Sequence, residues 1–286
     1  MSDIRTVGVV GCGLMGSGIA QVVAMTGHRT RVLETSQTVL ERGFARIRKF
    51  LDDGVAREKV TPDLRDATLA NLLPAAAAAD LGDCDIVIEA IIENLDEKRK
   101  LYAALEDVIG ADAILCSNTS SLCITELAAA TKRPDRFAGL HFFNPVPLMK
   151  LVEVIRALTT SDRTYEAVFA FGQALGKQAV TAPDRPGFIV NRLLVPFLLD
   201  AIRAYESGLG TLEDIDTAMK LGLGHPMGPF TLLDFVGLDT TYYIANIMFD
   251  EYREPAYAPP PLLKRMVLAG RLGRKSGRGF YDYGKG

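Results

Sequence analysis

Residues 4–20, IRTVGVVGCGLMGSGIA, decide the fold of the first part of the chain. A short apolar run typical of a buried strand comes first, and an apolar helix is expected to follow from about Gly16 to Met25. Between them stand three glycines with the spacing G-x-G-x-x-G: Gly11, Gly13 and Gly16. In a strand–loop–helix unit such glycines allow a tight turn, close approach of the backbone to a pyrophosphate, and close packing of helix on strand. The stretch therefore predicts a dinucleotide-binding loop at a helix N-terminus.

The loop and a carboxylate after it indicate which dinucleotide binds. Leu14 and Met15 lie between the second and third glycines, where we expect the chain to meet the cofactor. A second strand is expected over residues 28–34 and ends at Glu34, 18 residues after Gly16. An acidic side chain at this place accepts hydrogen bonds from the adenosine ribose and repels a 2′-phosphate. The sequence thus predicts NAD rather than NADP. The competing interpretation is a glycine-rich turn followed by an exposed glutamate.

Composition and charge narrow the class of protein. The chain has 286 residues, of which 48% are hydrophobic and 23% charged, as in ordinary globular proteins. A net charge of −3 provides no basic face, so nucleic acid is not an expected partner. No apolar run approaches the roughly 20 residues needed to cross a bilayer, and the N-terminus lacks signal-peptide features. We therefore expect a cytoplasmic protein with no membrane partner. The scattered cysteines and histidines predict reduced thiols and no metal site.

Strand-like and helix-like segments alternate over the first two-thirds of the chain. Ser36 and Asn94 are expected to cap the two longest helices of this part. A strand is expected at residues 85–91, and further short apolar runs continue the alternation. This pattern predicts an α/β fold with a Rossmann-type, doubly wound parallel sheet.

The character of the chain changes at residues 182–194, APDRPGFIVNRLL. Only helices are expected beyond it, with Pro196 as a kink in the first and Thr211 as the cap of another. We therefore predict an NAD-binding domain at residues 1–185. An all-helical C-terminal domain for substrate binding and dimerisation is predicted at residues 186–286.

Residues 140–155, LHFFNPVPLMKLVEVI, place a histidine and a carboxylate on neighbouring apolar segments. Burying either His141 or Glu153 alone is costly, whereas the two facing each other form a proton-transfer pair. Histidine suits a base that takes an alcohol proton, because its unperturbed pKa of about 6.5 lies near working pH. A carboxylate on the other ring nitrogen fixes the tautomer. Taken alone, His141 fits a hydrogen-bonded core histidine equally well, and Glu153 an edge-strand charge.

Several motifs together resemble the 3-hydroxyacyl-CoA dehydrogenases, above all their short bacterial form, the 3-hydroxybutyryl-CoA dehydrogenases. They are GCGLMG, SNTSSL, HFFNPVPLMKLVEVI, DRPGFIVNRLL and GHPMGPFTLLDFVGLD, and the resemblance extends to the closing GRGFYDY. It implies reversible, NAD-dependent oxidation of an (S)-3-hydroxyacyl-CoA to a 3-oxoacyl-CoA in fatty acid metabolism. The expected partners are an acyl-CoA substrate and a second copy of the chain.

The resemblance also implies roles for single residues. His141 matches the catalytic base and Glu153 its carboxylate partner. Ser120 and Asn191 match residues that approach the 3-oxygen of the substrate. The positions that match cofactor contacts, besides the glycine loop and Glu34, are Glu93, Lys98, Ser120, Asn144 and Lys275.

Most of these residues have a simpler alternative explanation. Ser120 could cap a helix, and Asn191 could hold the domain junction together. Lys98 and Glu93 could be surface charges. His225, in a Gly/Pro turn, is expected to be structural.

Three further points stay open at this level. Arg48 and Lys49 are candidates for contacting the coenzyme A phosphates, although a solvated helix face explains them as well. A dehydrogenase of free 3-hydroxy acids is a rival function, but its relatives use a lysine base in the helical domain, where the first lysine here is Lys220. A non-catalytic crystallin-like or cofactor-binding protein is the rival from another class. It could keep the glycine loop and lose the acid–base pair.

Overall fold

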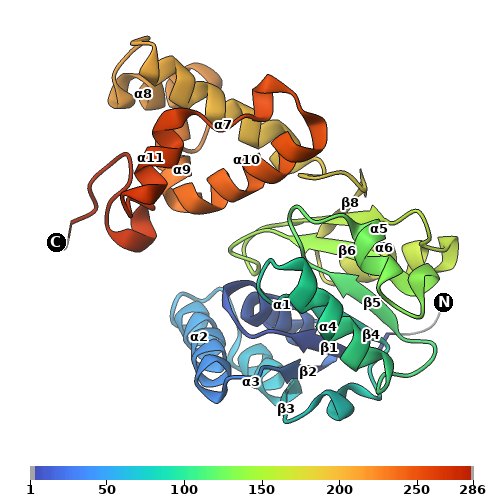
Figure 1. Cartoon of the computed structure of the whole chain (residues 1–286). Helices are drawn as coiled ribbons and strands as arrows, with labels where there is room; N and C mark the ends of the chain where they lie inside the picture. Colours follow the sequence, from blue (N-terminus) through green and yellow to red (C-terminus); the bar gives the residue numbers. More distant parts are fainter. Residues whose placement is uncertain (1–3, 285–286) are drawn as a thin grey trace. The chain divides into compact units, whose positions relative to one another are not determined.

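The computed structural model describes residues 4–284, which divide into two compact units. The first ends at Asp184 and the second begins at Arg185 (Figure 1). The first unit is an α/β fold and the second is helical, so the predicted fold class is confirmed. None of the described helices combines the length and apolar character that crossing a bilayer requires.

One sheet of eight strands forms the first unit, in the order β3-β2-β1-β4-β5-β6-β7-β8. The strands are β1 Thr6–Val10, β2 Arg29–Leu33, β3 Leu72–Ala75, β4 Ile86–Glu89, β5 Ile114–Ser117, β6 Phe137–Phe142, β7 Leu151–Arg156 and β8 Gln178–Pro183. Helices lie on both faces of the sheet, as expected for a doubly wound fold (Figure 1). Nearly every residue of β1, β4, β5 and β6 is buried, because helices cover strands in such a sheet on both sides.

The sheet departs from the predicted all-parallel arrangement at one pair. β6 and β7 are antiparallel, whereas all the other neighbours are parallel. Only residues 143–150 connect β6 to β7. A parallel crossover needs a dozen or more residues, so this short connection forces the chain to turn back beside β6.

The helices of the first unit are α1 Leu14–Met25, α2 Gln37–Ala56, α3 Pro62–Asn71, α4 Leu95–Glu106, α5 Ile124–Ala129 and α6 Asp162–Ala174, with 3₁₀ turns η1 Ala78–Leu81 and η2 Pro134–Arg136. Two of these helices, α2 and α4, begin directly after the capping residues predicted for them. Ser36 accepts a hydrogen bond from the backbone N–H of Val39, and Asn94 from that of Glu97, so both predicted caps are confirmed. Helix α3 and strand β3 were not predicted, although Thr61 caps α3 just before a proline at its first position.

The second unit consists of helices that pack around their own apolar core. They are α7 Val190–Glu206, α8 Leu212–Leu223, α9 Pro229–Val236, α10 Leu238–Tyr252 and α11 Pro261–Leu268, with 3₁₀ turns η3 Pro255–Tyr257 and η4 Arg274–Ser276. Thr211 caps α8 as predicted, and Pro196 lies inside α7. Gly237, at a φ of 102°, separates α9 from α10. Leu198, Phe230 and Met248 are among the residues of the core.

Candidate active site

The glycine loop follows β1 directly and leads into α1. Gly11 has a φ of 95°, and a Cβ there would lie 2.6 Å from the carbonyl oxygen of Ala90. A Cβ on Gly16 would lie 1.9 Å from the carbonyl oxygen of Gly11, so neighbouring backbone excludes any side chain at both positions. Gly13 differs, because a Cβ there would meet nothing within 4 Å. The chain itself does not require glycine at this position, whereas close approach by a dinucleotide phosphate does.

Glu34 lies beside this loop and is bonded to it. Its Oε2 accepts a hydrogen bond from the backbone N–H of Cys12 at 2.9 Å, and its Oε1 accepts one from that of Ser36 at 3.2 Å. The carboxylate is half-buried and comes directly after the last residue of β2, at the carboxyl edge of the sheet. Leu14, 57% exposed, begins α1 with Met15 after it. These residues fit NAD, and their contacts with it stay predictions.

His141 and Glu153 face each other across two strands. They are register partners in the antiparallel β6–β7 pair, which explains how residues twelve apart in sequence come together. The His141 Nδ1 lies 2.7 Å from the Glu153 Oε2, and the two residues are 4% and 0% exposed. The predicted facing pair is therefore confirmed as a hydrogen bond, and its catalytic role stays a prediction.

The other ring nitrogen of the histidine reaches a serine. His141 Nε2 lies 3.1 Å from the Ser120 Oγ, so Glu153, His141 and Ser120 form a continuous chain of hydrogen bonds. Ser120 caps no helix, because α5 begins after Cys123 and has no side-chain cap. The alternative explanation for Ser120 is therefore wrong.

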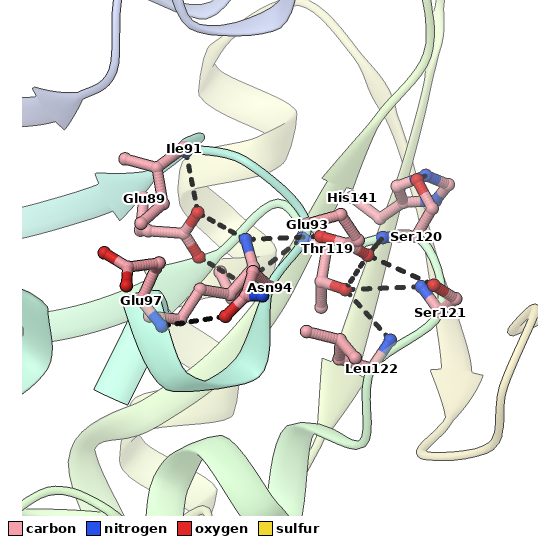
Figure 2. Close-up of polar contacts among 12 residues, drawn as sticks. Glu89, Ile91, Glu93, Asn94, Glu97, Thr119, Ser120, Ser121, Leu122 and His141 are labelled. Atoms are coloured by element: carbon pink, nitrogen blue, oxygen red, sulfur yellow. Dashed lines mark hydrogen bonds and ion pairs between the residues drawn. The ribbon is translucent and has the colours of Figure 1, made fainter. Parts of the chain in front are cut away.

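The loop that carries Ser120 is held by Glu93. Glu93 Oε1 accepts hydrogen bonds from the Ser120 backbone N–H at 3.0 Å, from the Ser121 hydroxyl at 3.2 Å and from the Thr119 hydroxyl (Figure 2). Lys98 is 1% exposed, and its Nζ lies 2.5 Å from Glu89 and 3.3 Å from Glu93. Neither residue is a simple surface charge, so that alternative is wrong for both. Their contacts with the cofactor stay predictions.

One of the remaining predicted positions lies in a loop of the first unit, and the other two lie in the second unit. Asn144 is exposed in the connection between β6 and β7. Asn191 is half-buried on α7, and the exposed Lys275 forms an ion pair of 2.6 Å with Asp239. The roles of these three residues in binding stay predictions.

The candidates for coenzyme A contacts lie on α2. Arg48 and Lys49 are both exposed, and Lys49 pairs with Asp53 one helical turn later. His225 packs edge-on against Phe197, as a structural residue does.

Sequence reasoning missed the residues behind the serine loop: Glu89, Tyr102, Ser117 and Thr119. Glu89 could have been found, because it is a carboxylate with apolar residues on both sides in the stretch DIVIEAI, residues 85–91. A carboxylate in an apolar run was also the signal for Glu153, whereas Glu34 was identified by its place 18 residues after Gly16. Tyr102 and Ser117 carry no such signal, since a tyrosine on a helix or a serine ending a strand is ordinary.

The same sheet carries two features of a dehydrogenase. A glycine loop suited to a dinucleotide follows β1, and a buried histidine supported by a carboxylate lies on β6. A histidine held in this way takes or gives one proton, and a nicotinamide takes or gives a hydride. The first unit therefore defines the class of nicotinamide-dependent dehydrogenases.

Comparison with known proteins identifies the family. The model of the 3-hydroxyacyl-CoA dehydrogenase NAD-binding domain matches residues 6–185, and that of the C-terminal domain of the same enzymes matches residues 187–283. The chain belongs to the 3-hydroxyacyl-CoA dehydrogenase family.

Relatives match along the whole chain. A 3-hydroxybutyryl-CoA dehydrogenase of Mycobacterium tuberculosis is 51% identical, over 99% of this chain and 100% of its own. The human mitochondrial hydroxyacyl-coenzyme A dehydrogenase is 48% identical, over 98% of this chain and 91% of its own. The crystal structure of (S)-3-hydroxybutyryl-CoA dehydrogenase PaaH1 from Ralstonia eutropha is 46% identical. It has a TM-score of 0.95 and covers 99% of this chain and 100% of its own.

Proposed function

We propose that this NAD-dependent dehydrogenase interconverts (S)-3-hydroxybutyryl-CoA and 3-oxobutyryl-CoA. The balanced reaction is (S)-3-hydroxybutyryl-CoA + NAD⁺ ⇌ 3-oxobutyryl-CoA + NADH + H⁺. The observation that carries the proposal is the hydrogen-bonded chain from Glu153 through His141 to Ser120. Relatives named for this substrate, at about half identity along the whole chain, support the four-carbon acyl group.

The residues of the first unit divide the work of the reaction. NAD, when bound, supplies the acceptor for the hydride that leaves C3. His141 takes the hydroxyl proton at Nε2. Glu153 accepts a hydrogen bond from the Nδ1–H, which keeps the proton of the neutral ring on Nδ1 and leaves Nε2 as the basic nitrogen. Ser120 holds the 3-oxygen within reach of that nitrogen. In the reverse direction the imidazolium returns the proton.

A series of substrates tests this proposal. We would measure kcat/KM for 3-hydroxyacyl-CoA thioesters of increasing chain length, with NAD and NADP in parallel and free 3-hydroxybutyrate as the control. The highest value is expected for the four-carbon thioester with NAD. A maximum at a longer chain contradicts the substrate assignment, and preferential turnover of free 3-hydroxybutyrate contradicts the thioester.

A homodimer in the cytoplasm is part of the same proposal. Leu193, Leu221 and Leu223 in the second unit are 73%, 81% and 65% exposed and are the residues that a second copy of the chain would cover in this proposal. The described cysteines are all free, which supports a reducing compartment. Analytical ultracentrifugation at micromolar concentration should give about twice the chain mass, whereas a monomer contradicts the dimer.

A further inference from the structure

Glu89, the last residue of β4, is a buried carboxylate to which the reaction assigns no role. It is 0% exposed and accepts four hydrogen bonds, which is about the full capacity of a carboxylate. The Lys98 ammonium, at 2.5 Å, and the Ile91 backbone N–H, at 2.8 Å, donate to Oε1. The hydroxyls of Tyr102, at 2.9 Å, and Ser117, at 2.7 Å, donate to Oε2. With every acceptor site filled by the protein, this carboxylate has no capacity to contact a substrate.

Tyr102 is suited to act as a permanent donor in this cluster. Burial, reinforced by the negative charge of Glu89, raises the pKa of its phenol well above the usual value. The hydroxyl therefore keeps its proton throughout the working pH range and continues to donate to Glu89.

Such a cluster contributes little net stability to the fold. A buried ion pair often contributes no more than well-packed apolar residues of the same volume, because both charges lose their hydration. Glu89 and Lys98, at 0% and 1% exposure, have lost nearly all contact with water. What the pair does provide is fixed geometry, since each bond constrains both partners.

Two separate routes lead from Glu89 to the loop that carries Ser120. Figure 2 shows Glu89 and Glu93 together with Thr119 and Ser120 of this loop. Along the first, Lys98 bridges Glu89 and Glu93, and Glu93 accepts the Ser120 backbone N–H at 3.0 Å. Along the second, the Ser117 hydroxyl that donates to Glu89 also accepts the Thr119 backbone N–H at 3.2 Å. Both routes end on the backbone of residues 119–120, which places the Ser120 hydroxyl 3.1 Å from His141 Nε2.

We propose that Glu89 is a positioning residue of this dehydrogenase, which holds the Ser120 loop in register with His141 through Lys98–Glu93 and through Ser117. This inference rests on the proposed function, because it assumes that Ser120 and His141 act on the substrate oxygen. Glu89 itself contacts only the protein.

A double-mutant cycle tests the proposal through activity. Glu89→Gln keeps the shape of the side chain but replaces two acceptor sites by donors and removes the charge that pairs with Lys98. We expect kcat to fall about 10- to 100-fold, because a displacement on the order of 1 Å at a catalytic group costs up to about 10²-fold. In a Ser120→Ala background the same substitution should lower kcat less than about threefold, since residues of one network are coupled. Equal losses in both backgrounds overturn the proposal.

A second readout does not depend on turnover. Hydrogen exchange of the Ser120 amide, followed by NMR, should be at least about tenfold faster in Glu89→Gln than in the wild type. The matched control is Glu106→Gln, which alters another buried carboxylate of the same unit, bonded to Arg133 at 3.0 Å. The control should change neither the Ser120 exchange nor kcat. Equal exchange rates in the two variants, at comparable melting temperatures, overturn the positioning role.

Tyr102→Phe covers the case in which Glu89→Gln does not fold. It removes only one of the four hydrogen bonds and should lower kcat about twofold to fivefold, an effect that disappears in the Ser120→Ala background. Persistence of the loss in that background overturns the proposal. A wild-type enzyme that is inactive on 3-hydroxybutyryl-CoA defeats the proposed function instead, and the exchange experiment still decides whether Glu89 holds the loop.

Discussion

The sheet of the first unit buries two side-chain pairs that look alike and differ in one respect. His141–Glu153 joins β6 to β7 at 2.7 Å, and Lys98–Glu89 joins α4 to β4 at 2.5 Å. All four residues are at most 4% exposed. The histidine has a second nitrogen that reaches the partly exposed Ser120. The Glu89 carboxylate instead accepts four hydrogen bonds, all from groups of the protein.

This difference separates groups that can react from groups that can only hold others in place. A proton-transfer group needs one face fixed and another within reach of the substrate, as the two nitrogens of His141 provide. A carboxylate whose acceptor sites are all occupied by the protein cannot contact the substrate, so it can affect the reaction only through the residues bonded to it. Burial and a short hydrogen bond are therefore not enough to identify a catalytic pair.

The largest expected effect comes from breaking the reactive pair. His141→Ala should lower kcat by about 10²–10⁴-fold, the usual contribution of general base catalysis, while NADH still binds. Steady-state kinetics and NADH fluorescence titration measure the two properties separately. His28→Ala is the matched control, because that histidine packs against Phe171 on the same unit. Near-normal turnover of the His141 variant would remove this residue from the mechanism.

Glu153→Gln should produce the next largest effect. The amide keeps the volume but can present a donor to Nδ1, which permits the wrong tautomer and leaves Nε2 protonated. We expect a loss in kcat on the order of 10²-fold, with a much smaller change in the melting temperature. Parallel activity and thermal-unfolding measurements test this expectation. A drop in stability that accounts for all of the lost activity would place Glu153 with Glu89, among the residues that only hold others.

The sequence predicted those site residues whose position relative to an expected strand could be recognised. Glu153 was identified as a carboxylate in an apolar run, Glu34 by its place at the end of the strand after the glycine loop, and the loop by its spacing between strand and helix. The antiparallel turn of β7 was missed, although the short connection after β6 made it readable. Local pattern alone thus predicted the layers of the fold, and it was connection length that determined the direction of one strand.

The support behind Ser120 could not be predicted in the same way. It depends on residues 89, 93, 98 and 117, which come from different elements and meet only in the folded sheet. Lys98 illustrates the limit, because a lysine four residues after a helix cap is usually exposed, whereas here it is buried between two carboxylates. Only tertiary contacts reveal that assignment.

The smallest of the expected effects comes from substituting Glu34, a carboxylate that is more exposed than Glu89. The two carboxylates stand at the ends of β2 and β4, the two neighbours of β1, but Glu34 is half-buried. Glu34→Ala should weaken NADH binding roughly tenfold, about 1.4 kcal/mol, and affect NADPH less, because the charge that repels a 2′-phosphate is gone. Fluorescence titration with both cofactors measures the ratio, and Glu41→Ala, exposed on α2, is the control.

Glu34→Gln separates the two possible duties of this side chain. The amide oxygen can still accept the hydrogen bond from the Cys12 N–H, so the bond to the glycine loop is kept, while the charge and the bond from the Ser36 N–H are lost. If Glu34 reads the ribose, Gln and Ala should both raise the affinity for NADPH relative to NADH. If Glu34 only holds the loop, Ala should weaken both cofactors equally and Gln neither. That outcome would make Glu34 a positioning residue, like Glu89. The preference for NAD over NADP would then not depend on the Glu34 carboxylate.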